Sequence, residues 1–200
     1  RDVRTGRFVP PQVVRAELDA YLANSAEPVI ALQDALRNGA INIADWQTAM
    51  REQIKNAHIN AIAESVGGYQ NMTPADYGRA GQIIREQYGY LRDFADEIVS
   101  GKQRLDGTLN RRAKMYVDAA RESYYKSINA KVQAGGITHI CSVLNPADHC
   151  QECIALDGRW YEINDPTYNP PGNRICRKNC KCSEKYGVMV GGQIVEVGAA

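Results

Sequence analysis

The chain has 200 residues, 44% of them hydrophobic, and its 24 Lys and Arg residues nearly balance its 23 Asp and Glu residues. This length suits one domain of ordinary size or two small ones, and the net charge of +1 excludes a strongly basic histone-like binder and an acidic tail protein. The composition argues against disorder along the whole chain, and the aliphatic runs are too short to span a bilayer. Nothing at the N-terminus resembles a signal peptide, and the start at Arg1 rather than Met leaves room for a missing leader or further domain.

The first helical stretch is expected after Pro10-Pro11. Apolar residues recur at helical spacing from there and again over 25–38, where Gly39 stands at the position of a C-terminal cap. A proline inside a helix removes a backbone hydrogen bond and crowds the preceding turn. Pro28 is therefore expected to break or kink the helix between these two pieces.

Three further amphipathic helices follow. The second is expected over 43–66, where a pair of glycines stops it. The third has the clearest start signal, because Thr73 can cap it and Pro74 occupies its first position, and Gly101 ends it. The fourth covers roughly 109–134 and also ends at a glycine pair. About four helices of this length predict a helical bundle or extended helical domain.

After residue 136 the helical periodicity gives way to short, β-branched runs. Strands are expected over 137–144, 158–163, 186–190 and 193–197, with Gly191-Gly192 as the hairpin turn between the last two. The sequence therefore predicts an α+β protein with a helical domain over 1–136 and a small Cys-rich β module over 137–200.

The arrangement of the cysteines indicates a metal-binding or disulfide-linked site. All six lie between Cys141 and Cys182, and five of them form two tight groups: Cys150 and Cys153, then Cys176, Cys180 and Cys182 after 22 intervening residues. Two such groups joined by a loop are typical of a tetrahedral zinc site, each group folding as a turn that presents its thiolates to the ion. A module with so few large apolar residues also needs a metal or disulfides to stay folded. The five clustered cysteines are the candidate ligands of a structural zinc ion, and the choice within the second group stays open.

Several alternatives compete with zinc. Disulfides would use the even number of cysteines, although no secretion signal is visible. A redox role for Cys150 and Cys153 lacks a thioredoxin-like strand and helix around the pair, and unpaired structural thiols are a further reading. Cys141 lies in an apolar run and is expected to be a buried core thiol. His149 is expected on the surface or outside the ligand set, because adjacent residues seldom bind one ion together.

The sequence contains no catalytic signature that would turn the metal into a reactive centre. Zinc deaminases carry a His-x-Glu segment upstream of Pro-Cys-x-x-Cys, and none of the three histidines here is followed by that pattern. HExxH, P-loop, nucleophile-elbow and GxGxxG motifs are also missing. We therefore expect a protein that is not an enzyme and has no small-molecule substrate.

Two stretches, 102–131 and 174–185, carry an excess of Lys and Arg over Asp and Glu. A solvated helix face and a solubilising loop explain them without a ligand. A more specific interpretation is that these basic residues contact nucleic-acid phosphate. The candidate contacts are Arg111, Arg112, Lys114, Arg121, Arg174, Arg177, Lys178 and Lys181.

The order of these features resembles the phage Mu F-like family of head morphogenesis (minor head or capsid) proteins. The matching segment runs from Cys150-x-x-Cys153 through Leu156 and Gly158, and a Pro/Gly-rich loop then leads to a closing Cys180-Lys181-Cys182. Weaker matches lie in the helical half, in the stretch from Tyr90 to Tyr116 and in the pattern Gly39, Trp46, Met50. The resemblance covers roughly residues 30–185.

The resemblance implies a metal role for Cys150, Cys153, Cys180 and Cys182. Many members have a His three residues before the closing pair, where this sequence has Arg177, and Cys176 is a replacement ligand nearby. It also implies a minor component of a tailed-phage head, made in the host cytoplasm and incorporated into the virion. Its partners would be portal or major capsid proteins, with double-stranded DNA as a further candidate partner and no membrane involved. The alternative is a zinc-stabilised nucleic-acid-binding module.

Overall fold

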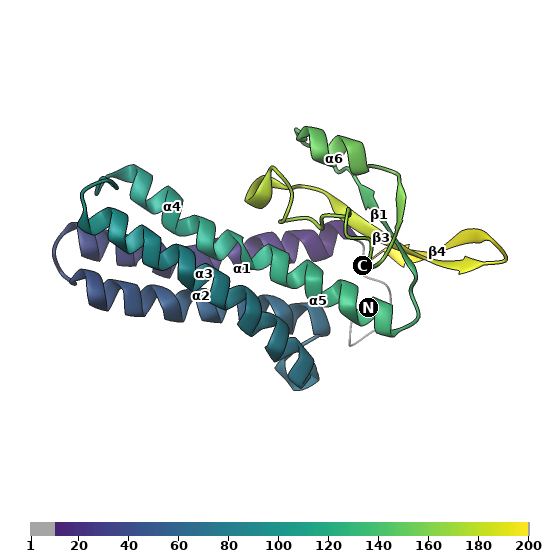
Figure 1. Ribbon diagram of the computed structural model, residues 1–200, viewed down its shortest axis with the longest axis horizontal. Coiled ribbons are helices and arrows are strands. Elements are labelled where there is room, and N and C mark those ends of the chain that lie inside the picture. Colours follow the sequence, from purple (N-terminus) through teal and green to yellow (C-terminus); the bar gives the residue numbers. More distant parts are fainter. Residues whose placement is uncertain (1–10, 200) are drawn as a thin grey trace.

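The computed structural model describes residues 11–199 and has the expected α+β architecture. Five long helices form an elongated bundle, and a four-stranded antiparallel sheet lies at one end of it, with its last hairpin projecting away from the helices (Figure 1). The bundle consists of α1 (Pro11–Arg37), α2 (Ile43–Val66), α3 (Pro74–Val99), α4 (Gly107–Asp118) and α5 (Ala120–Ala134), with a short 3-10 turn η1 (Tyr69–Asn71) before α3. Among the described helices, none is both long enough and apolar enough to cross a membrane.

Helix α1 continues through Pro28, so the expected break is wrong. Pro28 lies on the exposed face of the helix, where water can satisfy the carbonyl that loses its partner. On the opposite face Leu18, Leu22 and Val29 are all buried in the main core. Because apolar burial flanks the proline on both sides, tertiary packing keeps the two pieces in one helix.

The caps of α2 and α3 confirm their predicted bounds. The Asn42 side chain accepts a hydrogen bond from the Asp45 amide at 2.9 Å, and Gly67 ends α2 with a φ of 83° that favours glycine. At the start of α3, Thr73 and Asp76 form a reciprocal capping box, and Pro74 follows directly. These caps satisfy backbone groups that would otherwise lack partners.

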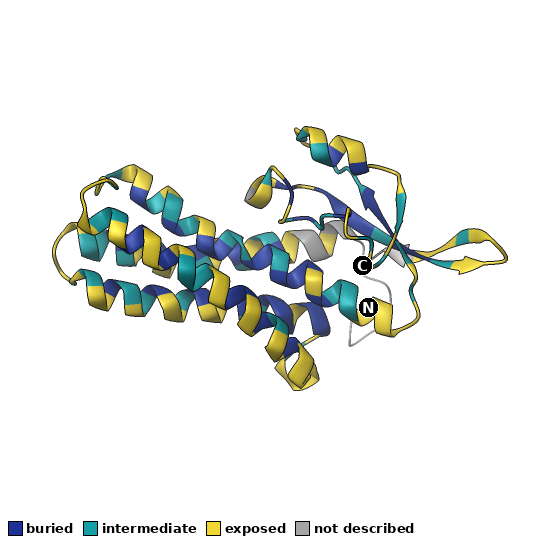
Figure 2. Cartoon of the chain, in the orientation of Figure 1, coloured by how far each residue is buried: buried dark blue, intermediate teal, exposed yellow. Residues whose placement is uncertain are grey.

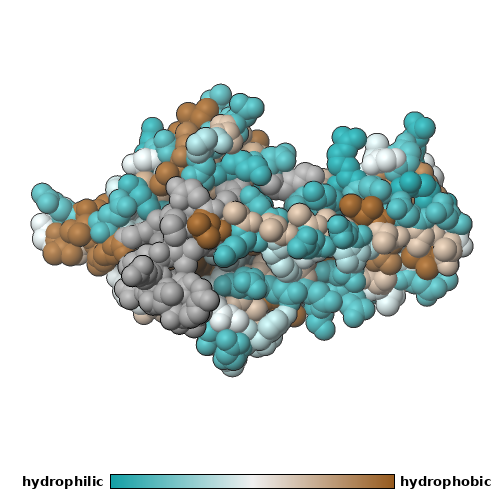
Figure 3. All heavy atoms as spheres, turned by 180° about the vertical axis from the view of Figure 1, so that it is seen from behind, coloured by the Kyte–Doolittle hydropathy of each residue, from teal (hydrophilic) through white to brown (hydrophobic). Residues whose placement is uncertain are grey.

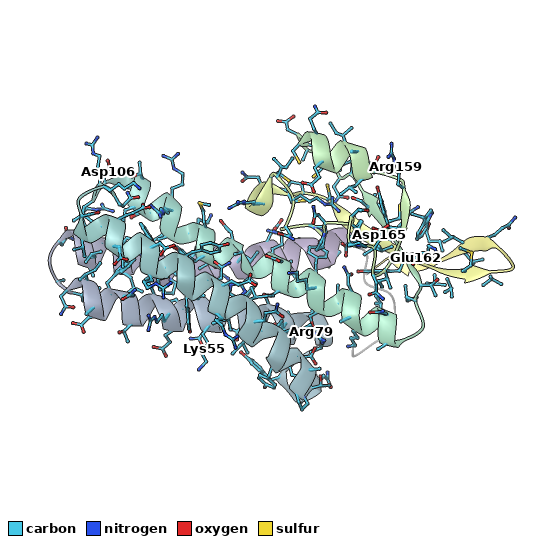
Figure 4. All side chains as sticks on the ribbon, in the orientation of Figure 1. Lys55, Arg79, Asp106, Arg159, Glu162 and Asp165 are labelled. Atoms are coloured by element: carbon cyan, nitrogen blue, oxygen red, sulfur yellow. The ribbon has the colours of Figure 1, made fainter. Side chains whose placement is uncertain are left out.

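The fourth predicted helix is divided into α4 and α5. Asp106 caps α4 by accepting a hydrogen bond from the Thr108 amide at 2.9 Å (Figure 4). The division falls at Ala119, whose backbone stays near helical values while the Glu122 amide bonds tightly back to the Ala119 carbonyl at 3.0 Å. A single tightened turn therefore separates the two helices without a change of residue type that the sequence would reveal.

The main core lies between the long helices, where Figure 2 shows buried residues along their inner faces. Trp46, Met50 and Phe94 are fully buried at its centre, and the rings of Trp46 and Phe94 meet edge to face at 5.5 Å. His58 is also buried here, with Nδ1 2.7 Å from the Ser123 hydroxyl. The bundle is thus held by side chains from all five helices.

The sheet has the order β2-β1-β3-β4. Its strands are β1 (His139–Val143), β2 (Trp160–Glu162), β3 (Ser183–Val190) and β4 (Gln193–Ala199), with all three neighbouring pairs antiparallel. The turn between β3 and β4 is Gly191-Gly192 as predicted, and both glycines have positive φ. Strand β3 begins three residues before its predicted start, because Ser183, Glu184 and Lys185 pair with β1.

Two short elements of the β module were not predicted. Helix α6 (Gln151–Leu156) begins directly after Cys150 and contains Cys153, where a turn was expected, and a 3-10 turn η2 (Arg177–Asn179) lies between Cys176 and Cys180. A run of six residues is too short to show helical periodicity in the sequence.

The β module packs against the end of the bundle through α5. The Tyr186 hydroxyl of β3 lies 2.7 Å from the side-chain oxygen of Asn129 in α5, and Val132 packs against the core of the module. The loop before the last cysteines also reaches α5, since a Cβ added to Gly172 would lie 3.0 Å from the Glu122 amide. This close approach requires a residue without a side chain at Gly172.

Candidate metal centre

Three segments of the β module bring the cysteines together. Cys150 and Cys153 belong to the start of α6, Cys176 precedes η2, and Cys180 and Cys182 lie between η2 and β3. They form one cluster in which three of the side chains are fully buried. The structure therefore unites residues that are more than twenty positions apart in the sequence.

Polar side chains position these segments. Glu152 of α6 accepts hydrogen bonds from the Ile175 amide at 2.7 Å and from the Asn169 side chain at 2.6 Å, which ties the loop to the helix. The Asn145 side chain donates to the Lys181 carbonyl at 2.7 Å, which ties the segment after β1 to the closing cysteines. Together these contacts hold α6, the loop before Cys176 and the segment of the closing cysteines close to one another.

Cys153 lies at the centre of the cluster. Its sulfur is 3.5 Å from that of Cys150, 3.5 Å from that of Cys176 and 3.9 Å from that of Cys180. A tetrahedral zinc ion with Zn–S bonds of about 2.3 Å holds its sulfur ligands about 3.8 Å apart. A disulfide bond would need about 2.05 Å. These separations fit thiolates around a metal ion.

His149 joins the cluster, contrary to the sequence expectation. Its Nδ1 is 3.7 Å from the sulfur of Cys182, and its Nε2 is 2.7 Å from the Asn145 carbonyl. Within 4.8 Å of one another, the ligand atoms of His149, Cys153 and Cys182 form one group, and those of Cys150, Cys153 and Cys176 form another. The imidazole is therefore a candidate ligand that sequence reasoning set aside.

Metal binding to this cluster would be coupled to the release of protons from its thiols. The hydrogen bond with Cys182 lowers the pKa of Cys180 to about 4, and the same contact raises the pKa of Cys182. Burial raises the pKa of Cys153 and of Cys176 above the usual value for a thiol. In the absence of a metal the cluster retains protons, which a divalent ion would release on binding.

Arg174 supplies a buried positive charge behind the central thiolate. Its Nη1 lies 3.9 Å from the sulfur of Cys153 and 2.9 Å from the Ser142 hydroxyl. Its Nε donates to the Asn169 carbonyl at 2.8 Å, and its Nη2 donates to the Tyr168 hydroxyl at 3.2 Å. The guanidinium is thus fixed by four partners and is only 1% exposed.

Beneath Arg174 lies a buried carboxyl group that no pattern in the sequence predicts. Glu184 accepts hydrogen bonds from the hydroxyls of Tyr168 at 2.9 Å and Tyr186 at 3.0 Å. Burial raises the pKa of Glu184 to about 7. The sequence neighbours of Glu184 are polar and charged, so no local pattern marks Glu184 as a core residue.

The donor set fits a metal ion. Thiolate sulfur and imidazole nitrogen are the ligands of structural zinc sites, and oxygen-seeking ions such as Mg²⁺ and Ca²⁺ prefer carboxylates. The cysteine and histidine cluster can therefore hold a metal ion. Cys141 lies apart from the two ligand groups as a fully buried thiol of β1, as the sequence indicated.

The candidate nucleic-acid contacts are not one surface. Arg121 is 4% exposed and paired with Asp19, and Arg174 is buried at the cysteine cluster, so the prediction that these two contact nucleic acid is wrong. Arg112 pairs with Glu97 and lies over the ring of Phe94. Of the rest, Lys114 is partly buried, the side chain of Lys178 lies outside the described residues, and Arg111, Arg177 and Lys181 are exposed.

In comparisons with known proteins, no family model, no curated protein and no solved structure matches this chain.

Proposed function

We propose that the chain is a structural and assembly component of a tailed-phage head, in which a metal-stabilised β module is carried at the end of a helical domain. The observation that carries this proposal is the cysteine cluster itself. Cys153, Cys180 and Cys182 are fully buried, and a buried set of thiolates is typical of a metal that stabilises a fold. The family resemblance of the cysteine motif supports the phage assignment.

The metal is proposed to be zinc. Zinc accepts sulfur and nitrogen ligands in tetrahedral geometry, and the spacing around Cys153 suits that geometry. When bound, the ion would supply crosslinks between α6, the loop before η2 and the start of β3. The hydrophobic core of the β module consists of four buried residues, Ile140, Leu156, Tyr168 and Tyr186. Because this core is small, the module would gain much of its stability from such crosslinks.

The proposed role is architectural and not catalytic. A catalytic zinc site keeps one position open for water or substrate and places a general base beside it. Here the cluster consists of thiolates and one imidazole, and Arg174 contacts it from the protein interior. The chain would act through protein partners, the portal or major capsid proteins, in the virion and during head assembly in the host cytoplasm, with no membrane or small-molecule substrate.

The hairpin of β3 and β4 offers such partners an apolar surface. Figure 3 shows hydrophobic side chains at the projecting end of the molecule, where Val190, Val195 and Val197 are 59%, 48% and 41% exposed. A contiguous exposed apolar patch is typical of a protein contact site. The patch lies on the part of the sheet that extends away from the bundle.

Co-purification tests this proposal. The chain, expressed with the portal and capsid proteins of the same genome, is expected to enter proheads and to appear in mature virions at low copy number. Val195→Glu should reduce its incorporation, whereas Val99→Glu, at a more exposed site at the end of α3, should not. A chain that never enters proheads or virions would contradict the proposal.

A second candidate function is a zinc-stabilised nucleic-acid-binding module. The exposed side chains of Arg111, Arg177 and Lys181 favour it, although Arg111 lies on α4 and the other two near η2. Binding to double-stranded DNA would then fall steeply as salt is raised, because phosphate contacts release counterions. Negligible binding at low salt would remove this candidate.

A further inference from the structure

The cysteine cluster contains more ligand atoms than one tetrahedral ion can use. Five thiol sulfurs and the Nδ1 of His149 lie together in the described part of the chain. Four of these donors saturate one zinc ion, which would leave two buried or partly buried donors without a metal. Six donors around two tetrahedral ions is instead the stoichiometry of Zn₂Cys₆ modules.

The contacts within the cluster divide in the way that two ions require. Two tetrahedra that share an edge have six corners, and each of the two shared corners neighbours every other corner. Cys153 has this property, since it belongs both to the group with Cys150 and Cys176 and to the group with His149 and Cys182. Cys180 belongs to neither group and is assigned the second shared corner as the remaining donor, because its sulfur is 3.9 Å from that of Cys153 and its side chain hydrogen-bonds with Cys182.

We propose that the centre binds two divalent metal ions of the zinc type, bridged by the thiolates of Cys153 and Cys180. Cys150 and Cys176 complete the ligand set of one ion. His149 and Cys182 complete that of the other. This inference rests on the proposed function only in requiring that the cluster binds metal, and it adds a second ion and a histidine ligand.

His149 is oriented as a ligand of the second ion. Its Nε2 lies 2.7 Å from the Asn145 carbonyl, which can only accept a hydrogen bond, so Nε2 carries the proton. Nδ1 then presents its lone pair toward the cluster, 3.7 Å from the sulfur of Cys182. Metal-bound histidines typically donate their other ring nitrogen to a backbone carbonyl or carboxylate in this manner.

The charges of the cluster also favour two ions. Two divalent cations bring four positive charges and five thiolates bring five negative ones, so the loaded centre carries one net negative charge. The buried guanidinium of Arg174, at 3.9 Å from Cys153, balances it. One ion bound by four thiolates would carry two negative charges, and a fifth thiol would remain uncoordinated beside it, so the balance with Arg174 is poorer.

The metal content of the full chain, purified under reducing conditions and measured by native mass spectrometry and elemental analysis, tests the proposal. Two zinc ions per chain are expected. One zinc ion per chain would overturn the second site while leaving a metal-stabilised module intact. A chain that lacks metal and contains disulfides would overturn both this inference and the metal role in the proposed function.

Variants of His149 assign the second site. His149→Ala should lower the content from two ions to one, and His149→Cys, which restores a ligand, should return it to two. Cys141→Ser is the matched control, because Cys141 lies outside both ligand groups, and it should keep two ions. An unchanged metal content in His149→Ala would overturn the assignment.

Cobalt spectroscopy of the unmodified chain gives a readout that does not depend on a variant folding. Two Co²⁺ ions that share thiolate bridges couple magnetically, so the electron paramagnetic resonance signal per cobalt should fall between one and two equivalents. A signal that rises in proportion to added cobalt up to saturation would contradict a bridged pair. Separate mononuclear binding would give that result.

Discussion

Arg174 illustrates how a single buried residue supports the candidate metal centre. It contacts the sulfur of Cys153 and three polar groups of the β module. Because it offsets thiolate charge, its loss should weaken metal binding more than it disturbs the packing of the module.

Replacement of Arg174 by Met keeps a long apolar side chain and removes the charge. We expect metal affinity, measured by competition with a chromophoric chelator, to fall by roughly 10- to 100-fold. Arg159→Met is the control, because Arg159 is exposed and points away from the module (Figure 4). Equal affinities in the two variants would contradict the role assigned to Arg174.

His58 gives the bundle a defined response to acid. Burial lowers the pKa of His58 to about 4, below its usual value near 6.5. Between these values the unfolded chain binds a proton that the folded chain does not, so the free energy of unfolding falls as the pH is lowered through that window. The loss amounts to about 3 kcal/mol at most.

His58→Met should remove this contribution. The difference in free energy of unfolding between wild type and variant, followed by denaturant titration from pH 7 to pH 4, should shift in favour of the variant as the pH falls. Both chains contain the same cysteine cluster, so metal loss in acid cancels in the comparison. A difference that does not vary with pH would show that His58 titrates normally.

At the scale of elements, the capping box of α3 is a local stabilising device. Thr73→Ala removes the side chain that accepts from the Asp76 amide, and it should lower the free energy of unfolding by about 1 kcal/mol. Thr48→Ala is the matched control, since the exposed Thr48 bonds only to the Ala44 carbonyl of its own helix. Chemical denaturation should show a loss for Thr73→Ala alone, and equal effects of the two variants would contradict the cap.

Pro28 is an interruption that α1 tolerates. Pro28→Ala should raise the free energy of unfolding by roughly 1–3 kcal/mol, because alanine restores the backbone donor and suits a helix interior. Glu27→Ala, at the neighbouring exposed position, should change it little. A loss of stability in Pro28→Ala would mean that the packing of α1 depends on a bend at that residue.

The elements that the sequence predicted well are those with local signals. Helices α2 and α3 have side-chain caps and glycine stops, which act within a few residues and are therefore legible in the sequence. The division of α4 from α5 rests on one tightened turn at Ala119 that no residue type marks, and the early start of β3 depends on its pairing with β1. Glu184 sits in β3 because two tyrosine hydroxyls from separate positions satisfy it.

The sequence predicted the cysteines of the candidate site but not its histidine. The objection to His149 was that it adjoins Cys150 in the sequence. The backbone of Cys150 is extended, with φ −76° and ψ 162°, and neighbouring side chains on extended backbone point in opposite directions. His149 and Cys150 therefore belong to different ligand groups. Spacing alone does not reveal such a change of direction.

At the scale of the whole molecule, two kinds of core stabilise the chain. The bundle buries a large apolar cluster shared by five helices, whereas the sheet has a small cluster and the cysteine centre. We therefore expect metal to matter unequally along the chain. Helices α1–α5 should retain their structure without it, and the segment from β1 to β4 should not.

Hydrogen exchange with and without a chelator, under reducing conditions, tests this central claim most directly. Chelation should abolish the protection of amides in α6, η2 and the β1–β3 pairing, while protection in α2 and α3 stays close to its original level. Retained protection throughout the β module after complete metal removal would contradict the claim that a metal centre holds this module together.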